Sequence, residues 1–202
     1  MRVASLTTFR QSPHVFYDWL RPLARISMAA APNPAHLALA EMERLGFLKA
    51  VITQNIDNLH QRAGSRTVLE LHGSMNNLVC PQCGRRTPSS DLSDVLMRED
   101  ILPTCEHCHV ILKPEIILYE EMLPVSAWTL AELHCHQCDI MLVIGTSLEV
   151  TPAAHLPMTA YQSGAHVIMI NLQPTYFDGY ADILLRDDAA SILPAIVEQL
   201  AY

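Results

Sequence analysis

The alternation of apolar and polar stretches along the chain predicts strands that alternate with helices. Short runs rich in Val, Ile and Leu, each ended by polar residues or glycine, are typical of strands buried in a parallel sheet. Strand followed by helix in this way predicts an α/β, Rossmann-like fold with a doubly wound parallel sheet. The expected strands are residues 50–53, 67–71, 140–144, 166–170 and 181–185, and helices are expected near residues 124–138, 152–163 and 189–200.

An N-terminal segment, residues 12–47, predicts two helices joined by a proline turn. A serine followed by proline is typical of a helix start, and glycine commonly ends a helix because it adopts the left-handed conformation. The first helix is expected from Ser12-Pro13 to about Ala31 and the second from Ala35 to Leu45, with Pro32-Asn33-Pro34 between them and Gly46 at the end.

The composition is that of an ordinary globular chain. Its 202 residues, 50% of them hydrophobic and 17% charged, suffice for one core and a small additional module. A formal net charge of −8 argues against nucleic-acid binding, which needs a basic face, and suits basic protein partners. The start lacks the layout of a secretory signal, and no apolar run approaches the roughly 20 residues of a membrane span. We therefore expect a cytoplasmic protein without a nucleic-acid or membrane partner.

All six cysteines occur in Cys-x-x-Cys pairs, which favours metal binding in a reducing compartment over disulfides. Two of the pairs are separated by a spacer of 21 residues, slightly longer than the usual spacer between the two pairs of a zinc site. Four thiolates complete a tetrahedral Zn²⁺ shell, so the zinc is expected to be structural; a redox dithiol is the alternative, and His107 and His109 are possible substitute ligands. The expected ligands are Cys80, Cys83, Cys105 and Cys108.

Residues 74–112, which contain these cysteines, interrupt the alternation of strands and helices. The segment is rich in Pro, Cys, Ser and Thr, and bound metal would hold so small a piece in shape. We therefore expect a zinc-ribbon-like insertion at 74–112 within a Rossmann-like domain formed by residues 1–73 and 113–202. The third pair, Cys135 and Cys138, lies at an expected helix, where burial is a simpler interpretation than metal or redox function.

Polar residues follow successive expected strands. Ligands of open α/β sheets bind beyond the carboxyl ends of the strands, and a glycine there lets backbone N–H groups approach a phosphate or ribose. Each residue alone is typical of a strand end where the chain merely turns, but their recurrence at one rim indicates a ligand site. The residues are Gln54, Asn55 and Asp57, then His72, then Gly145, Thr146 and Ser147, and finally Asn171.

These motifs together resemble the sirtuins, the NAD-dependent protein lysine deacylases. The resemblance extends over essentially the whole chain. It implies that an acyl group passes from an acylated lysine of a protein to ADP-ribose, that NAD is consumed and that nicotinamide is released. The motifs are the run from Thr53 to His60, Leu71-His72-Gly73, the two outer cysteine pairs, Gly145-Thr146-Ser147-Leu148 and Ile170-Asn171.

The resemblance also implies roles for individual residues. His72 would be the general base that accepts a proton relayed from the nicotinamide ribose, and a histidine with a pKa near 6.5 suits that task. Asn55 would orient the ribose and a water, Asp57 would hold the nicotinamide carboxamide, and Gln54 would bond ribose hydroxyls. The remaining cofactor-binding positions implied are Ile56 beside them, and Gly145, Thr146, Ser147, Asn171 and Ala189 for the adenosine half.

Two segments of the chain bear on the substrate. Sirtuins that remove acidic acyl groups use a Tyr-x-x-Arg pair, and the matching positions here are Leu20 and Leu23, which favours acetyl or a longer apolar acyl group unless Arg21 turns inward. Sirtuins also carry Phe-Gly-Glu where the substrate backbone pairs between two strands. Glu120 stands in place of that glycine, where it would either crowd a peptide or attract a basic one.

Sirtuins begin with a strand, a Gly-Ala-Gly-Ile-Ser phosphate loop and a helix, none of which occurs in this sequence. Because the first strand is central in this sheet, its absence is expected to split the sheet and leave an unpaired edge on each side. Three outcomes are open: a start upstream of Met1, a strand supplied by another chain, or closure of the two half-sheets. We favour the first and expect the isolated 202-residue chain to bind NAD poorly and to show little activity.

Two other functions remain open at the level of sequence. Protein mono-ADP-ribosyl transfer would use the same cofactor site and release nicotinamide. A non-catalytic, zinc-stabilised module would bind acylated lysine without turnover. The sequence does not specify the protein substrate or the oligomeric state.

Overall fold

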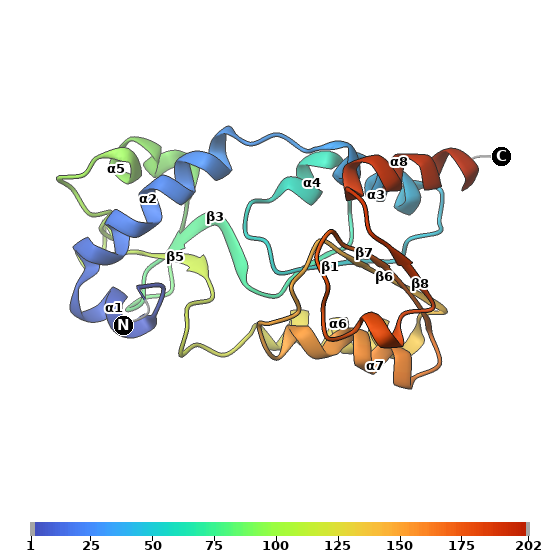
Figure 1. The fold of residues 1–202 in the computed structure, drawn as a ribbon. Helices are drawn as coiled ribbons and strands as arrows, with labels where there is room; N and C mark the ends of the chain where they lie inside the picture. The colour runs from blue at the N-terminus through green and yellow to red at the C-terminus, as the bar shows by residue number, and fades with distance from the viewer. Residues whose placement is uncertain (1–2, 201–202) are drawn as a thin grey trace. The chain divides into compact units, whose positions relative to one another are not determined.

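A computed structural model describes residues 3–200, which pack into two compact units (Figure 1). The predicted domains, 1–73 with 113–202 around an inserted 74–112, divide the chain differently and remain a proposal; their outer limits at residues 1 and 202 lie outside the described residues. Unit 1 comprises Met1–Ala30, Gln54–Asn58 and His72–Pro124, and unit 2 comprises Ala31–Thr53, Leu59–Leu71 and Val125–Tyr202.

Unit 1 begins with two helices, α1 (Leu6–Gln11) and α2 (Pro13–Ala29). The side chain of Ser5 caps α1 by accepting the N–H of Thr8. Proline begins α2, where its missing N–H costs no helical hydrogen bond. The predicted helix from Pro13 is therefore confirmed, and it ends two residues earlier than expected.

The cysteine-containing part of unit 1 is built on an antiparallel sheet in the order β4-β3-β5. The sequence pattern did not predict these strands. In the longest, buried apolar positions are few and polar residues such as Asn76 and Asn77 occupy its middle, so the period of two is weak. The elements are β3 (Gly73–Val79), β4 (Arg86–Pro88), η1 (Ser89–Leu92), α5 (Ser93–Met97) and β5 (Lys113–Ile116).

Helix α2 packs on this sheet through fully buried side chains, among them Phe16 and Leu20. Arg21 on the same helix is only 2% exposed. Its guanidinium donates to the backbone carbonyls of Leu96 (3.2 Å) and Ile101 (2.8 Å) and to the Asp18 carboxylate (2.8 Å). A buried charge with this many hydrogen-bond partners is held in one position. Arg21 therefore joins α2 to the segment around α5.

The described part of unit 2 contains five parallel strands, each within two residues of its predicted position. Strand β1 (Val51–Thr53) pairs with β2 (Val68–Glu70), with Val51 opposite Val68. The other three form a separate sheet in the order β6-β7-β8, and the α/β parallel architecture is thus confirmed. These strands are β6 (Ile140–Ile144), β7 (His166–Ile170) and β8 (Ile183–Leu185).

The parallel strands form two sheets rather than one. Among the described strands, β1 is hydrogen-bonded only to β2, and β6 only to β7. The predicted split is therefore confirmed, and the half-sheets have not closed on each other. The split leaves β6 without a pairing strand on one side. All five of its residues are apolar, yet only Val143 among them is buried and Ile140 is 56% exposed.

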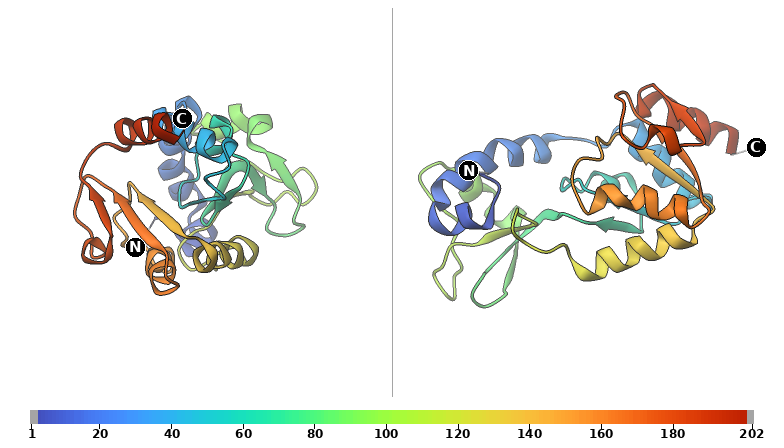
Figure 2. Two further views of the ribbon diagram at one scale, coloured as in Figure 1. Left: turned by 90° about the vertical axis from the view of Figure 1, so that its right-hand side faces the viewer. Right: turned by 60° about the horizontal axis from the view of Figure 1, so that its bottom comes forward.

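Helices cover both faces of the β6-β7-β8 sheet (Figure 2). Leu142 and Ile144 pack in one apolar cluster with α3 (Pro34–Arg44) and α8 (Ala189–Leu200). Met141 and Val143 point to the other face, covered by α6 (Val125–Gln137) and α7 (Leu156–Gln162), as the alternation of side chains along a strand requires.

No helix in the described part of the chain has the length and apolar character needed to cross a membrane. The shorter elements are α4 (Leu59–Ala63), η2 (Ala153–His155) and η3 (Asp178–Tyr180).

Candidate active site and metal centre

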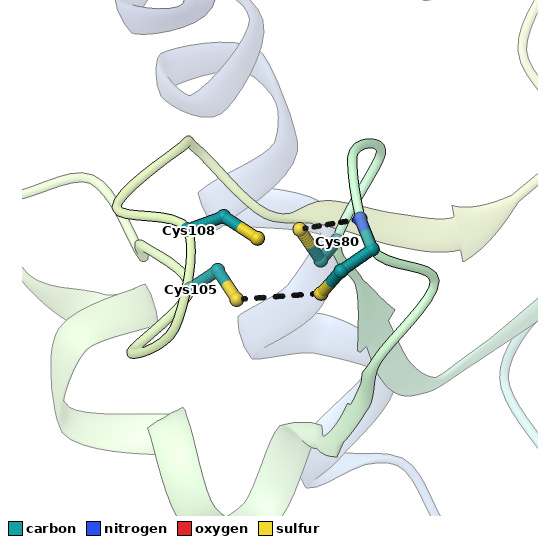
Figure 3. Close-up of side chains that lie close together, drawn as sticks. Cys80, Cys105 and Cys108 are labelled. Atoms are coloured by element: carbon teal, nitrogen blue, oxygen red, sulfur yellow. Dashed lines mark hydrogen bonds between the residues drawn. The ribbon is translucent and has the colours of Figure 1, made fainter.

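Four cysteine sulfurs converge in unit 1 from the two loops that the sequence singled out (Figure 3). The sulfurs of Cys80, Cys83, Cys105 and Cys108 all lie within 4.8 Å of one another, and those of Cys83 and Cys105 are 3.9 Å apart. Zinc–sulfur bonds of about 2.3 Å in a tetrahedron place the sulfurs about 3.8 Å apart. The donor set therefore fits a structural Zn²⁺ with no open coordination position.

Both cysteine loops use the same turn. The N–H of Gly84 donates to the Cys80 carbonyl (2.9 Å), and the N–H of His109 donates to the Cys105 carbonyl (2.8 Å). Gly84 (φ +71°) and His109 (φ +55°) both adopt the left-handed conformation that such a turn needs. Among the described residues, the cysteines are the one group of at least three potential metal ligands. His109 thus shapes the turn.

The third cysteine pair lies where α6 ends. Cys135 is 1% exposed, and burial, with smaller effects from Cys138 and Glu132, raises the pKa of its thiol to about 12. Burial also raises the pKa of Cys138. Since the thiolate is the reactive form, both side chains are held in their inert state, which supports the interpretation as buried packing residues.

His72 is positioned by the buried residue before it and by its own backbone carbonyl. Leu71 is fully buried, and the His72 carbonyl accepts the N–H of Ile117 (2.8 Å). The imidazole Nδ1 lies 3.2 Å from the backbone carbonyl oxygen of Gln54. Because a carbonyl only accepts, Nδ1 carries the hydrogen and Nε2 retains its lone pair. Burial lowers the pKa of His72, partly offset by this hydrogen bond.

The loop at residues 54–58 is fastened beside His72 within unit 1. Besides the Gln54 contact, the N–H of Met75 donates to the carbonyl of Ile56 (3.0 Å). Asn55 is exposed and Asp57 is half-buried. The structure therefore brings the predicted amide and carboxylate residues to the segment that carries the predicted base.

The remaining predicted cofactor residues gather at strand ends in unit 2. Asn171 is 7% exposed, and its side-chain NH₂ donates to the carbonyls of Thr146 (2.9 Å) and Gln173 (2.8 Å). Gly145 has φ +57°, and a Cβ there would meet nothing within 4 Å, so its backbone is open to a ligand. Ser147 is exposed in the same loop, and Ala189 begins α8 after β8.

Glu120 makes a contact that the sequence did not reveal. Its φ is +79°, and its carboxylate accepts hydrogen bonds from the backbone N–H (3.0 Å) and hydroxyl (2.7 Å) of Thr7. The side chain thus satisfies a donor in the first turn of α1, where negative charge is favourable. Because 113 positions separate the two residues, no local pattern could have indicated the pair.

The glycine after His72 is required by close packing. A Cβ on Gly73 would lie 2.1 Å from the Glu115 carbonyl oxygen of β5, and its φ is +71°. We expect Gly73→Ala to destabilise the protein by about 3 kcal/mol or more in urea unfolding, because it combines a backbone clash with left-handed strain.

Gly84→Ala is the matched control for that substitution. Gly84 has the same φ of +71°, but nothing lies within 4 Å of its would-be Cβ. The Gly84→Ala variant should therefore lose only the backbone-strain part of the stability, about 1–2 kcal/mol of unfolding free energy. Equal unfolding free energies for the two variants would contradict the close approach of Glu115 to Gly73.

Comparison with known proteins agrees with this geometry. The model of the Sir2 family matches residues 1–152. An "NAD-dependent protein deacylase 2" from Archaeoglobus fulgidus is 43% identical over 199 residues, which cover 98% of this chain and 78% of that protein. An "NAD-dependent protein deacylase" from Pyrococcus furiosus is 38% identical over 200 residues, 98% of this chain and 80% of the relative.

Solved structures show the same similarity in three dimensions. A Sir2 enzyme bound to a propionylated peptide has a TM-score of 0.92 and 36% identity, covering 98% of this chain and 83% of the other. A Sir2 homologue in complex with NAD has a TM-score of 0.92 and 36% identity, covering 98% and 76%. The fold is therefore that of Rossmann-like α/β proteins with a four-cysteine, zinc-binding module. The chain belongs to the Sir2 family.

Proposed function

We propose that this protein is an NAD-dependent protein lysine deacylase, which transfers the acyl group of a modified lysine to ADP-ribose and releases nicotinamide. The observation that carries the proposal is the contact of His72 Nδ1 with the Gln54 carbonyl, 3.2 Å away, at the start of the loop that carries Asn55 and Asp57. Relatives named as deacylases, 38–43% identical over almost the whole chain, support it.

His72 is the proposed general base. Its Nδ1–H is used on the Gln54 carbonyl, so Nε2 is the atom that accepts a proton. Burial lowers the pKa of the imidazole, which keeps it neutral and ready to accept at pH 7. The proton it receives is the one relayed from the nicotinamide ribose.

The loop beside His72 is the proposed site for the nicotinamide end of NAD. Bound NAD supplies the ADP-ribosyl group that takes the acyl group and carries nicotinamide as the leaving group. Asn55 orients the ribose and a water, Asp57 binds the carboxamide, Gln54 binds ribose hydroxyls, and Ile56 lies between them. The Met75–Ile56 backbone hydrogen bond supports this assignment, because it holds the loop in a fixed position relative to His72.

The strand ends of unit 2 are the proposed site for the adenosine half. Asn171 donates both hydrogens of its side-chain amide to the carbonyls of Thr146 and Gln173. Its Oδ1 is then the side-chain atom that accepts a hydrogen bond from the ligand. The open backbone of Gly145, with Ser147 and Ala189, completes the proposed set.

The proposed acyl group is acetyl or a longer apolar chain. Leu20 is 1% exposed in the core of unit 1, and the Arg21 guanidinium is engaged by two backbone carbonyls and Asp18. Arg21 is therefore not expected to turn toward an acidic acyl group, because this movement would leave those two carbonyls without a hydrogen-bond donor and cost stability. We also propose a cytoplasmic location, in keeping with six free cysteines.

An assay of products tests the proposal. The protein is incubated with NAD and an acetyl-lysine peptide, and the products are separated by mass spectrometry. Deacetylated peptide, nicotinamide and O-acetyl-ADP-ribose in equal amounts are expected, formed slowly because the isolated chain is expected to bind NAD poorly. ADP-ribosylated protein without O-acetyl-ADP-ribose would indicate transfer to protein instead. Peptide binding without any product would indicate a binding module.

The pH dependence of deacetylation should report the lowered pKa of His72. The base acts when it is unprotonated, so kcat/KM falls as pH drops through its pKa. Since burial lowers that pKa from the ordinary 6.5, the midpoint of the acid limb is expected below pH 6.5. A profile of kcat/KM between pH 5 and 8 measures it. A midpoint above 6.5 would mean that another group limits the rate or that the imidazole is not buried in solution.

A further inference from the structure

Arg186, the first residue after β8, joins loops that follow two neighbouring strands. Its guanidinium donates to the carbonyls of Asn171 (3.0 Å) and Gln173 (2.7 Å), both in the loop after β7. It also donates to the carboxylate of Asp178, which in turn accepts the N–H and hydroxyl of Thr175 (3.1 and 3.0 Å). One side chain thus holds the whole 171–178 segment against the end of β8.

The network continues to the third strand through Asn171. Its side-chain amide donates to the carbonyl of Thr146, which lies in the loop after β6, and again to Gln173. The loops after β6, β7 and β8 are therefore linked by two side chains. Asn171 is 7% exposed and the side chain of Arg186 is 31% exposed, so the links are shielded from solvent in part.

We propose that Arg186 is a positioning residue for the adenosine half of the dinucleotide. This inference rests on the proposed function, because Asn171, Thr146 and Gly145 are its adenosine-binding residues. Arg186 itself touches backbone carbonyls and Asp178. Its action is to fix the position of Asn171, and through Asn171 that of the glycine loop.

The contacts explain why arginine is needed. Arg186 donates from two of its nitrogens to three acceptors, an arrangement that the planar, forked guanidinium matches and a single ammonium does not. Strand β8 does not depend on it for pairing, since the N–H of Asn171 still donates to the Leu185 carbonyl (3.1 Å). Loss of the guanidinium should therefore loosen the loops while the sheet remains.

The test compares Arg186→Gln and Arg186→Lys with Arg44→Gln in the full chain. Arg44 is the matched control, because it lies in the same unit and, among the described residues, its ion pair is with Glu41 on the exposed side of α3. Dissociation constants are measured by calorimetry for NAD, for ADP-ribose and for an acetyl-lysine peptide, together with the melting temperature. For Arg186→Gln we expect NAD and ADP-ribose to bind about tenfold more weakly, equivalent to about 1.4 kcal/mol. Peptide affinity should change less than about twofold, and Arg186→Lys should lie between.

Several results would overturn the inference. Unchanged ADP-ribose binding by Arg186→Gln, with or without a lower melting temperature, would show that the network only stabilises the fold. Equal losses for ADP-ribose and peptide would show general destabilisation. In both cases the wild-type protein still binds NAD, so the proposed function stands. NAD binding by the wild-type chain is expected to be weak; wild-type protein that binds neither NAD nor ADP-ribose even at concentrations that would fill a weak site would overturn the inference and the proposed function together.

Discussion

Replacing Cys105 by Ser is expected to abolish zinc binding and to unfold the cysteine-containing part of unit 1. Four thiolates complete the coordination shell, and one hydroxyl in place of a thiolate leaves it incomplete. Structural zinc sites contribute about 10–16 kcal/mol, whereas whole domains are stable by only about 5–15 kcal/mol. Metal analysis should find one zinc per wild-type chain and almost none in the variant, with loss of near-ultraviolet circular dichroism.

Cys135→Ser is the control for this experiment. Cys135 is as deeply buried as Cys105, at 1% against 2% exposed, yet it lies in α6 of unit 2. It should keep one zinc per chain and lose only the about 1–3 kcal/mol usual for a polar substitution in a core. A Cys105→Ser protein that retains one zinc and the wild-type melting temperature would disprove a structural site at these four residues.

The effect of zinc loss should extend beyond the two turns. Cys80, Cys105 and Leu112 belong to the same buried cluster as Phe16 and Leu20 of α2. Within this unit the helix therefore packs on a surface that the metal holds in place. Melting of the cysteine turns should also free the carbonyl of Ile101, on which the buried Arg21 depends.

Local sequence signals predicted the elements that local chemistry determines. Helix α3 begins where Asn33 accepts the N–H of His36 and where Pro34 takes the first position, and it is followed by Gly46 at φ +86°. The apolar runs of β6 and β7 likewise identified parallel strands. In each case the determining residues are neighbours in the chain, so a short window contains the whole explanation.

What the sequence did not reveal depends on contacts between distant residues. Gly73 is packed against Glu115, Thr7 is bonded to Glu120, and Arg186 reaches back to Asn171. The sequence did carry one signal for the last of these, since Arg186 follows an expected strand at the same rim as the predicted ligands. It was missed because an arginine after a strand is also a common solvated residue.

The candidate site followed the same division between local and distant signals. Motif residues were recognised because chemistry restricts their type, as with His72 and the four cysteines. The groups that hold these side chains in place were not recognised, because they are backbone carbonyls. The Gln54 carbonyl holds His72, and the Thr146 carbonyl holds Asn171. Every residue has a carbonyl, so its use as a positioning partner leaves no mark on the sequence.

His72→Ala should reduce kcat for deacetylation of an acetyl-lysine peptide by about 10²–10⁴-fold, the usual contribution of a positioned general base. The substitution removes the one atom, Nε2, assigned to accept the proton, while Gln54 loses only a single donor to its carbonyl. Because that carbonyl lies at a half-buried residue, water can replace the donor, and the melting temperature should change little.

His136→Ala provides the control, since His136 is exposed on α6 and, in the described part of the chain, its side chain bonds the hydroxyl of Ser163. It should retain wild-type kcat. Calorimetry of both variants with NAD should give similar dissociation constants, which separates loss of the base from loss of binding. A His72→Ala enzyme with more than about a tenth of the wild-type kcat would place the base elsewhere, because no positioned base contributes so little. The Gln54 contact would then serve only to hold the loop.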